Sequence, residues 1–144
     1  MCHARMIPAV RRPGYGYPNA PPDPHWLERP SGVLAEIPPT TLRWCGMRLP
    51  AAGGAYLRLL PYSVVRTAFR QSERRGVPGT FYIHPWEIDP AQPRLAVPWL
   101  TRVRHYGGLE RTTQRVERLL SEFRFTAVRD TVVALAPNRQ AAVA

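Results

Sequence analysis

The pattern of apolar and polar residues predicts two amphipathic helices, over residues 61–75 and 109–123. In the first, apolar side chains recur at the three- and four-residue spacing of one helix face; they are Leu60, Val64, Val65, Ala68 and Phe69. Pro61 suits the first helical turn, and Gly76 suits the position after the last turn. In the second, the apolar stripe consists of Val116, Leu119, Leu120 and Phe123. Both helices are expected to pack their apolar stripes against a sheet.

Shorter apolar runs predict β-strands at residues 32–37, 80–84 and 125–129, with a further extended piece around residues 42–44. The run Phe81-Tyr82-Ile83 is expected to be the central strand. Strands that alternate with helices indicate an α/β fold. The right-handed crossover rule favours parallel neighbours within one sheet.

We expect the 144-residue chain to have three parts, of which one is large enough to bury a core. Residues 1–31 hold seven of the 17 prolines. This lead is expected to be extended and irregular, because each proline fixes φ and removes a backbone donor. Residues 32–135 are expected to form the folded domain, and residues 136–144 a flexible tail.

The formal net charge is +10, and all 20 basic residues are arginine. The arginines are spread along the chain rather than gathered into one block. A nucleic-acid binder commonly uses lysine as well as arginine, and the absence of lysine is typical of codon bias in a GC-rich bacterial genome. A basic nucleic-acid-binding protein therefore stays as the weaker alternative.

The remaining composition favours a soluble, cytoplasmic protein without a membrane partner. The two cysteines, Cys2 and Cys45, do not indicate a disulfide framework. The chain starts without the apolar region of a signal peptide. It contains no apolar run of the ~20 residues that a membrane span needs.

The most distinctive run is residues 79–90, where a histidine follows an apolar segment and precedes a proline-rich loop with a tryptophan and two carboxylates. Reacting groups gather at the carboxyl ends of the strands in parallel α/β folds. His84 is a candidate general acid, because imidazole titrates near neutral pH. Glu87 or Asp89 is a candidate to orient its ring, and Trp86 to wall a pocket or stack on a sugar.

Other interpretations of the same residues stay open. A histidine at this place is commonly structural, and Trp86 is equally suited to core packing. None of the four histidines is spaced from another His, Cys or Asp as metal ligands are. No metal site is therefore expected in this chain.

Residues 81–94, Phe-Tyr-Ile-His-Pro-Trp-Glu-Ile-Asp-Pro-Ala-Gln-Pro-Arg, resemble the last catalytic motif of NodB-type polysaccharide deacetylases. The resemblance is closest to the subgroup associated with exopolysaccharide and exosortase gene clusters, whose C-terminal region is the domain DUF3473. The similarity spans roughly residues 15 to 130. Further runs that fit the same region lie at residues 36–43, 50–62, 104–106, 110–112 and 123–126.

The resemblance implies a (β/α) barrel that hydrolyses N-acetyl groups on a sugar polymer. In the family a divalent metal, commonly zinc, is held by an Asp-His-His set, and an Asp serves as base. The histidine that matches His84 protonates the leaving amine. The motifs that hold the metal belong before the matched region and are absent from this sequence. We therefore expect an incomplete barrel that is inactive alone and needs a complementing N-terminal chain. A non-enzymatic accessory or polysaccharide-binding module is the alternative.

Overall fold

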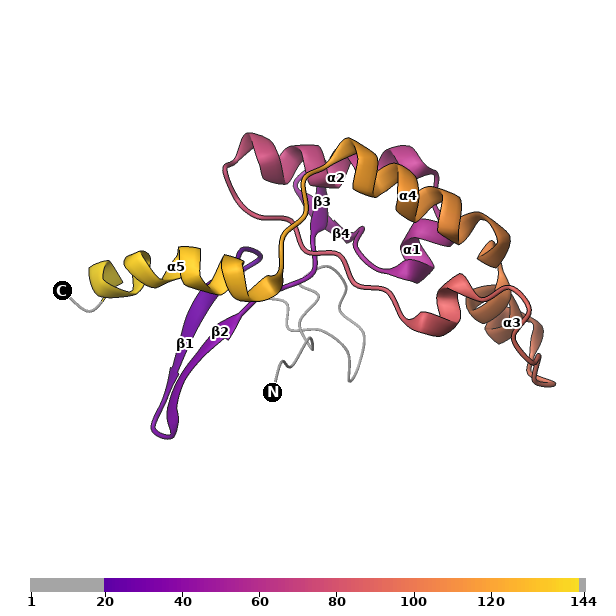
Figure 1. The fold of residues 1–144 in the computed structure, drawn as a ribbon, viewed down its shortest axis with the longest axis horizontal. Helices are drawn as coiled ribbons and strands as arrows, with labels where there is room; N and C mark the ends of the chain where they lie inside the picture. The colour runs from indigo at the N-terminus through magenta and orange to yellow at the C-terminus, as the bar shows by residue number, and fades with distance from the viewer. Residues whose placement is uncertain (1–19, 143–144) are drawn as a thin grey trace.

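The structure is a computed structural model, and it describes residues 20–142, with side chains as far as residue 136. Strands come first along the chain and helices follow (Figure 1). The elements in chain order are β1 (His25–Arg29), β2 (Gly32–Glu36), β3 (Thr41–Trp44), β4 (Met47–Pro50), α1 (Gly54–Leu59), α2 (Tyr62–Arg74), the 3₁₀ turn η1 (Pro85–Ile88), α3 (Trp99–Tyr106), the 3₁₀ turn η2 (Leu109–Arg111), α4 (Thr112–Glu122) and α5 (Val128–Ala142).

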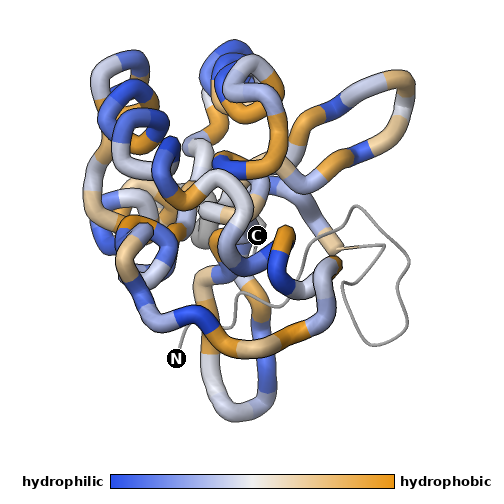
Figure 2. Tube along the Cα trace, turned by 90° about the vertical axis from the view of Figure 1, so that its right-hand side faces the viewer, coloured by the Kyte–Doolittle hydropathy of each residue, from blue (hydrophilic) through white to orange (hydrophobic). Residues whose placement is uncertain are grey.

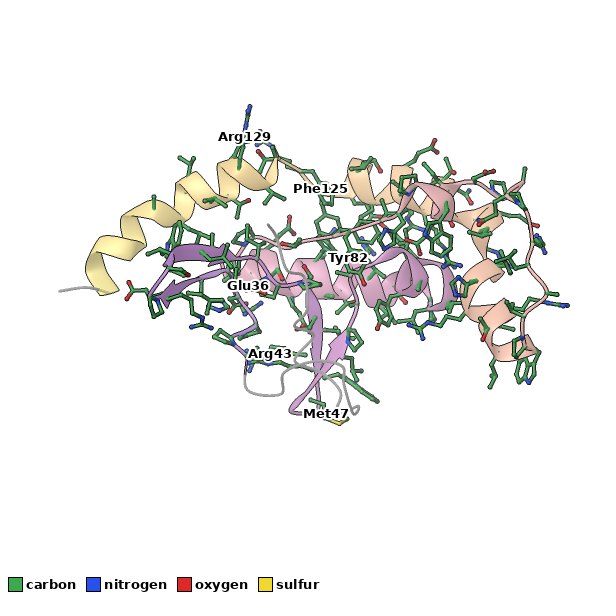
Figure 3. The ribbon with its side chains drawn as sticks, turned by 90° about the horizontal axis from the view of Figure 1, so that it is seen from below. Glu36, Arg43, Met47, Tyr82, Phe125 and Arg129 are labelled. Carbon is green, nitrogen blue, oxygen red and sulfur yellow. The ribbon has the colours of Figure 1, made fainter. Side chains whose placement is uncertain are left out.

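The strands form two separate antiparallel hairpins, β1–β2 and β3–β4. In the second hairpin, Thr41 lies opposite Pro50 and Trp44 opposite Met47. Cys45 and Gly46 make the turn, both with positive φ (48° and 75°), as the favoured two-residue hairpin turns require. Figure 3 shows Met47 at the outer end of this hairpin. The prediction of one parallel sheet is wrong, because two-residue turns can join only antiparallel neighbours.

The strands predicted at residues 80–84 and 125–129 are also wrong. Residues 80–84 are extended without a place in either sheet. The backbone N–H and the Oγ1 of Thr40 both donate to the carbonyl oxygen of Thr80 (3.1 and 3.0 Å). Residues from Val128 onward form α5 instead of a strand. The coarser prediction of mixed α and β structure is confirmed, and the strands within residues 20–142 close no barrel.

The ends of the chain differ from the predicted lead and tail. Strand β1 lies within the lead that was expected to be irregular, and α5 continues through residue 142 of the expected flexible tail. Residues 1–19 and 143–144, which include Cys2, lie outside the described residues.

The two predicted helices are confirmed as α2 and as η2 with α4. Gly76 (φ 64°) ends α2: its N–H donates to the carbonyl of Glu73, and the N–H of Val77 donates to that of Ser72. Figure 2 shows hydrophobic and hydrophilic residues alternating along the helices. Within the part of the chain that the structure describes, no helix is both long and apolar enough to cross a membrane.

The hydrophobic core lies between α1, α2 and α4. Phe69 is at its centre, with its ring centroid 5.4 Å from that of Phe123 and 6.4 Å from that of Phe81. The buried members of this core are Leu57, Val65, Phe69, Leu119 and Phe123. The extended segment that carries Phe81 is thus fixed to the helices by its side chains rather than by sheet hydrogen bonds.

Candidate functional site

Three of the four predicted site residues lie around one cavity of about 200 Å³ between α1, η1 and the C-terminal end of α3. They are His84, Trp86 and Glu87, and the other lining residues are Gly54, Ala55, Arg58, Tyr82, Arg104 and His105. Asp89 is not in the lining, and its Oδ1 accepts the backbone N–H of Ala91 (3.0 Å). The structure therefore groups Glu87, but not Asp89, with the candidate acid.

A buried ion pair forms the base of this cavity. The Nη2 of Arg58 lies 3.0 Å from the Oε1 of Glu87, and the two side chains are 0% and 3% exposed. Arg58 also donates to the carbonyls that end α3, those of Arg104 (3.3 Å), His105 (3.0 Å) and Gly107 (2.8 Å). These carbonyls have no partner within their own helix. Arg58 thus joins α1, η1 and α3 into one unit.

Glu87 fixes the backbone that carries the candidate acid. Its Oε2 accepts the N–H of His84 (3.0 Å), and its own N–H donates to the carbonyl of His84 (2.9 Å). The carboxylate also packs against Gly54, where an added Cβ would lie 2.1 Å from Oε2. Since both carboxylate oxygens are engaged by Arg58 and by backbone, Glu87 positions the main chain of His84 rather than its ring.

Aromatic rings line one side of the cavity in a row. His84 and Trp86 lie nearly parallel, with centroids 6.1 Å apart and 8° between the planes. Tyr82 meets His84 edge-on at 6.0 Å, and His105 lies 5.6 Å from Trp86. Trp86 is half-buried, with the Arg58 guanidinium 5.4 Å from its centroid, whereas His84 is exposed. A ligand in the cavity can therefore reach the His84 imidazole.

The expected position of His84 at the carboxyl end of a strand is wrong. His84 ends the extended segment after Thr80 and precedes η1, and this segment joins neither hairpin of the described chain. The packing of Phe81 in the core and the bonds from Glu87 hold the imidazole at the cavity instead. The position of His84 is thus set by the packing of Phe81 in the core and by the buried Glu87 carboxylate.

The side chains around the cavity do not match the zinc site of the NodB-type deacetylases that the sequence resembles. Residues 20–142 contain no group of three or more His, Cys, Asp or Glu side chains that could hold a metal ion. The cavity offers two imidazoles, and its single carboxylate is already paired with Arg58. A zinc site needs at least three protein ligands. The cavity of this chain therefore does not supply a complete set of zinc ligands.

Arg58, Arg104 and His105 line the cavity, although the sequence did not single them out as candidates. One signal was available for Arg58, which stands inside the apolar run Tyr56-Leu57-Arg58-Leu59-Leu60. An arginine in such a run is buried with a partner far more often than without one. Arg104 and His105 lie in the run 104–106 that fits the resembling family, but that run did not indicate a role at the site.

Helices α2 and α4 carry side chains whose pKa values are shifted by their neighbours. A hydrogen bond from Arg118 (2.8 Å) lowers the pKa of the Glu122 carboxyl, and the charge of Arg66 (2.7 Å) lowers it further. Burial raises the pKa of the Tyr62 hydroxyl, and the neighbouring Glu122 charge adds to this effect. These groups tie α2 to α4 and do not line the cavity.

Comparison with known protein families matches residues 6–133 to a domain of unknown function, DUF3473. No curated protein matches the chain. No solved structure matches it either.

Proposed function

Since this chain belongs to the DUF3473 family, we propose that it acts as the C-terminal part of a NodB-type polysaccharide deacetylase, with His84 as the general acid. The observation that carries the proposal is the exposed His84 imidazole at a cavity. Its backbone is held by the buried Glu87–Arg58 pair. A proton donor needs this combination of fixed position and access to the substrate.

In the proposed reaction, water adds to the acetyl carbonyl of an N-acetylated sugar and the C–N bond then breaks. The imidazolium of His84 gives its proton to the departing nitrogen, so that an amine leaves rather than an amide anion. The cationic Arg104 lies in the same cavity lining and favours binding of a ligand that carries negative charge. The rings of Tyr82 and Trp86 provide apolar surface for a sugar.

The metal and the general base of this reaction come, in our proposal, from a second polypeptide or domain. When bound there, zinc would polarise the acetyl carbonyl and activate the water. The cavity of DUF3473 would then complete the site from the side of the leaving amine. The chain alone is expected to release no acetate, with or without added zinc.

The test combines this chain with a NodB-type polypeptide that carries the Asp-His-His motifs and measures acetate release from an N-acetylated oligosaccharide. His84→Ala is expected to lower the rate by roughly 10²–10⁴-fold, which is the usual contribution of a positioned acid. His25→Ala is the matched control, because His25 lies in β1 and is not in the cavity lining. An unchanged rate in His84→Ala removes this histidine from the role, and acetate release by the chain alone contradicts the need for a partner.

A polysaccharide-binding module without catalysis is the second candidate, and the row of aromatic rings beside the cavity favours it. Stacking on such rings needs no proton transfer. In this case His84→Gln keeps the affinity of the isolated chain for the oligosaccharide, whereas Trp86→Ala lowers it. Isothermal titration calorimetry together with the acetate assay distinguishes the two candidates, because only a catalytic His84 changes the rate of acetate release.

A further inference from the structure

Helix α3 and the loop before it expose large apolar side chains. Leu95 and Trp99 are each 69% exposed, Leu100 is 66% exposed and Val103 is 46% exposed. No residue of α3 is buried. We refer to Leu95, Trp99, Leu100 and Val103 as the α3 patch. Scattered single apolar residues are normal on protein surfaces, but here four large apolar side chains are exposed within nine positions of the chain.

The α3 patch has a basic border. At about 100° per residue, Trp99, Leu100 and Val103 share an arc of about 100°, with Arg104 about 40° beyond one edge and Arg102 about 60° beyond the other. Between Asp89 and Glu110 the chain has three arginines and no acidic residue. An apolar arc flanked by cations is the pattern of helices that lie in the headgroup region of a membrane.

The α3 patch is held firmly at one end of the molecule. Figures 1 and 3 both show α3 at the opposite end of the long axis from α5. Arg58 binds the carbonyls that end α3, and the hydroxyl of Tyr106 accepts the N–H of Leu95 (3.1 Å). These bonds link the loop and the helix, so the apolar side chains are presented together on a projecting end.

We propose that the α3 patch is an interfacial anchor that binds the surface of an anionic lipid bilayer. Trp99, Leu100, Leu95 and Val103 enter the headgroup region, while Arg102 and Arg104 contact lipid phosphates. A projecting apolar end fits a broad, flat surface, and the absence of acidic residues favours an anionic one. Because Arg104 also lines the cavity, this contact places the cavity mouth next to the bilayer. The proposal concerns a surface contact rather than a span, and it does not depend on the deacetylase role.

The experiment is co-sedimentation of the full chain with vesicles of phosphatidylcholine, with and without phosphatidylglycerol, at low and high salt. The chain is expected to bind the vesicles that contain phosphatidylglycerol and to bind less at high salt. Trp99→Ala with Leu100→Ala is expected to lower the partition coefficient on the order of tenfold or more. Arg102→Gln is expected to lower it about fivefold, as one charge near an anionic surface should.

Trp44→Ala is the matched control, because Trp44 is 60% exposed on the β3–β4 hairpin. It should leave the partition coefficient unchanged, and circular dichroism should show that every variant is folded. Failure of the natural chain to bind vesicles that contain phosphatidylglycerol overturns the proposal. Equal binding by the Trp99→Ala/Leu100→Ala variant also overturns it. If vesicle binding is absent and this variant loses affinity for the complementing polypeptide, the α3 patch is a protein interface instead.

Discussion

Replacing Glu87 by glutamine removes the charge that neutralises the buried Arg58 while it preserves side-chain volume. Both side chains of this pair are at most 3% exposed, so water cannot take the place of the lost carboxylate. Removing one partner of a buried pair costs about 3–5 kcal/mol, because the other charge stays buried without compensation. The new amide adds to the loss, because its oxygen can accept from only one of the two donors, the Arg58 guanidinium and the N–H of His84, and its NH₂ must face the other.

The assay is thermal and urea unfolding followed by far-UV circular dichroism. For a domain of this size, a loss of about 3–5 kcal/mol lowers the midpoint of thermal unfolding by about 10–20 °C. Asp89→Asn is the matched control, because this nearby carboxylate is exposed and accepts one backbone N–H. The free energy of unfolding of the Asp89→Asn control should stay within about 0.5 kcal/mol of that of the natural chain. A loss below about 1 kcal/mol in Glu87→Gln would refute the reasoning that Glu87 compensates the buried charge of Arg58.

Two further predictions concern the same fold. Gly54→Ala should destabilise the chain by a similar amount and disturb the cavity, because the new methyl would lie 2.1 Å from Oε2 of Glu87. A crystal structure of this variant in which the Glu87 carboxylate has not moved would contradict the prediction. The lowered pKa of Glu122, caused first by its hydrogen bond from Arg118, contributes stability that is present above the pKa of an unfolded carboxyl and is lost as pH falls through the lower folded pKa. Thermal unfolding between neutral and acidic pH should therefore show a weaker pH dependence in Glu122→Gln than in the natural chain.

The sequence predicted α2 and α4 well because the signals of these two helices are local. The apolar stripe of α2, the proline before it and the glycine after it all lie within about 16 consecutive residues. The strands at residues 80–84 and 125–129 were mispredicted for the opposite reason. Alternating apolar side chains such as Phe81 and Ile83 are typical of strands, but a strand also needs a pairing partner from elsewhere in the chain. Here Phe81 packs into the helical core instead.

The sequence predicted the part of the candidate site that lies within one short run of residues. His84, Trp86 and Glu87 are close along the chain and lie around the same cavity. The role of Glu87 in holding the main chain was not predictable, because its partner Arg58 lies 29 residues away. Arg104 and His105 reach the site because the end of α3 packs on Arg58, and this tertiary contact leaves no mark in the local sequence.

The hydrogen bonds of Arg58 connect atoms that are 29 to 49 residues apart in the chain, whereas each hairpin turns within a few residues. Closing long loops costs entropy before the contact is made, so we expect contacts of this kind to form late in folding. The hairpins and α2 can form before the cavity exists. We expect these bonds to make η1, the end of α3 and the cavity open together, as one cooperative unit with a shared rate of amide hydrogen exchange. The cavity that exposes His84 is therefore expected only in molecules in which these long-range contacts have formed.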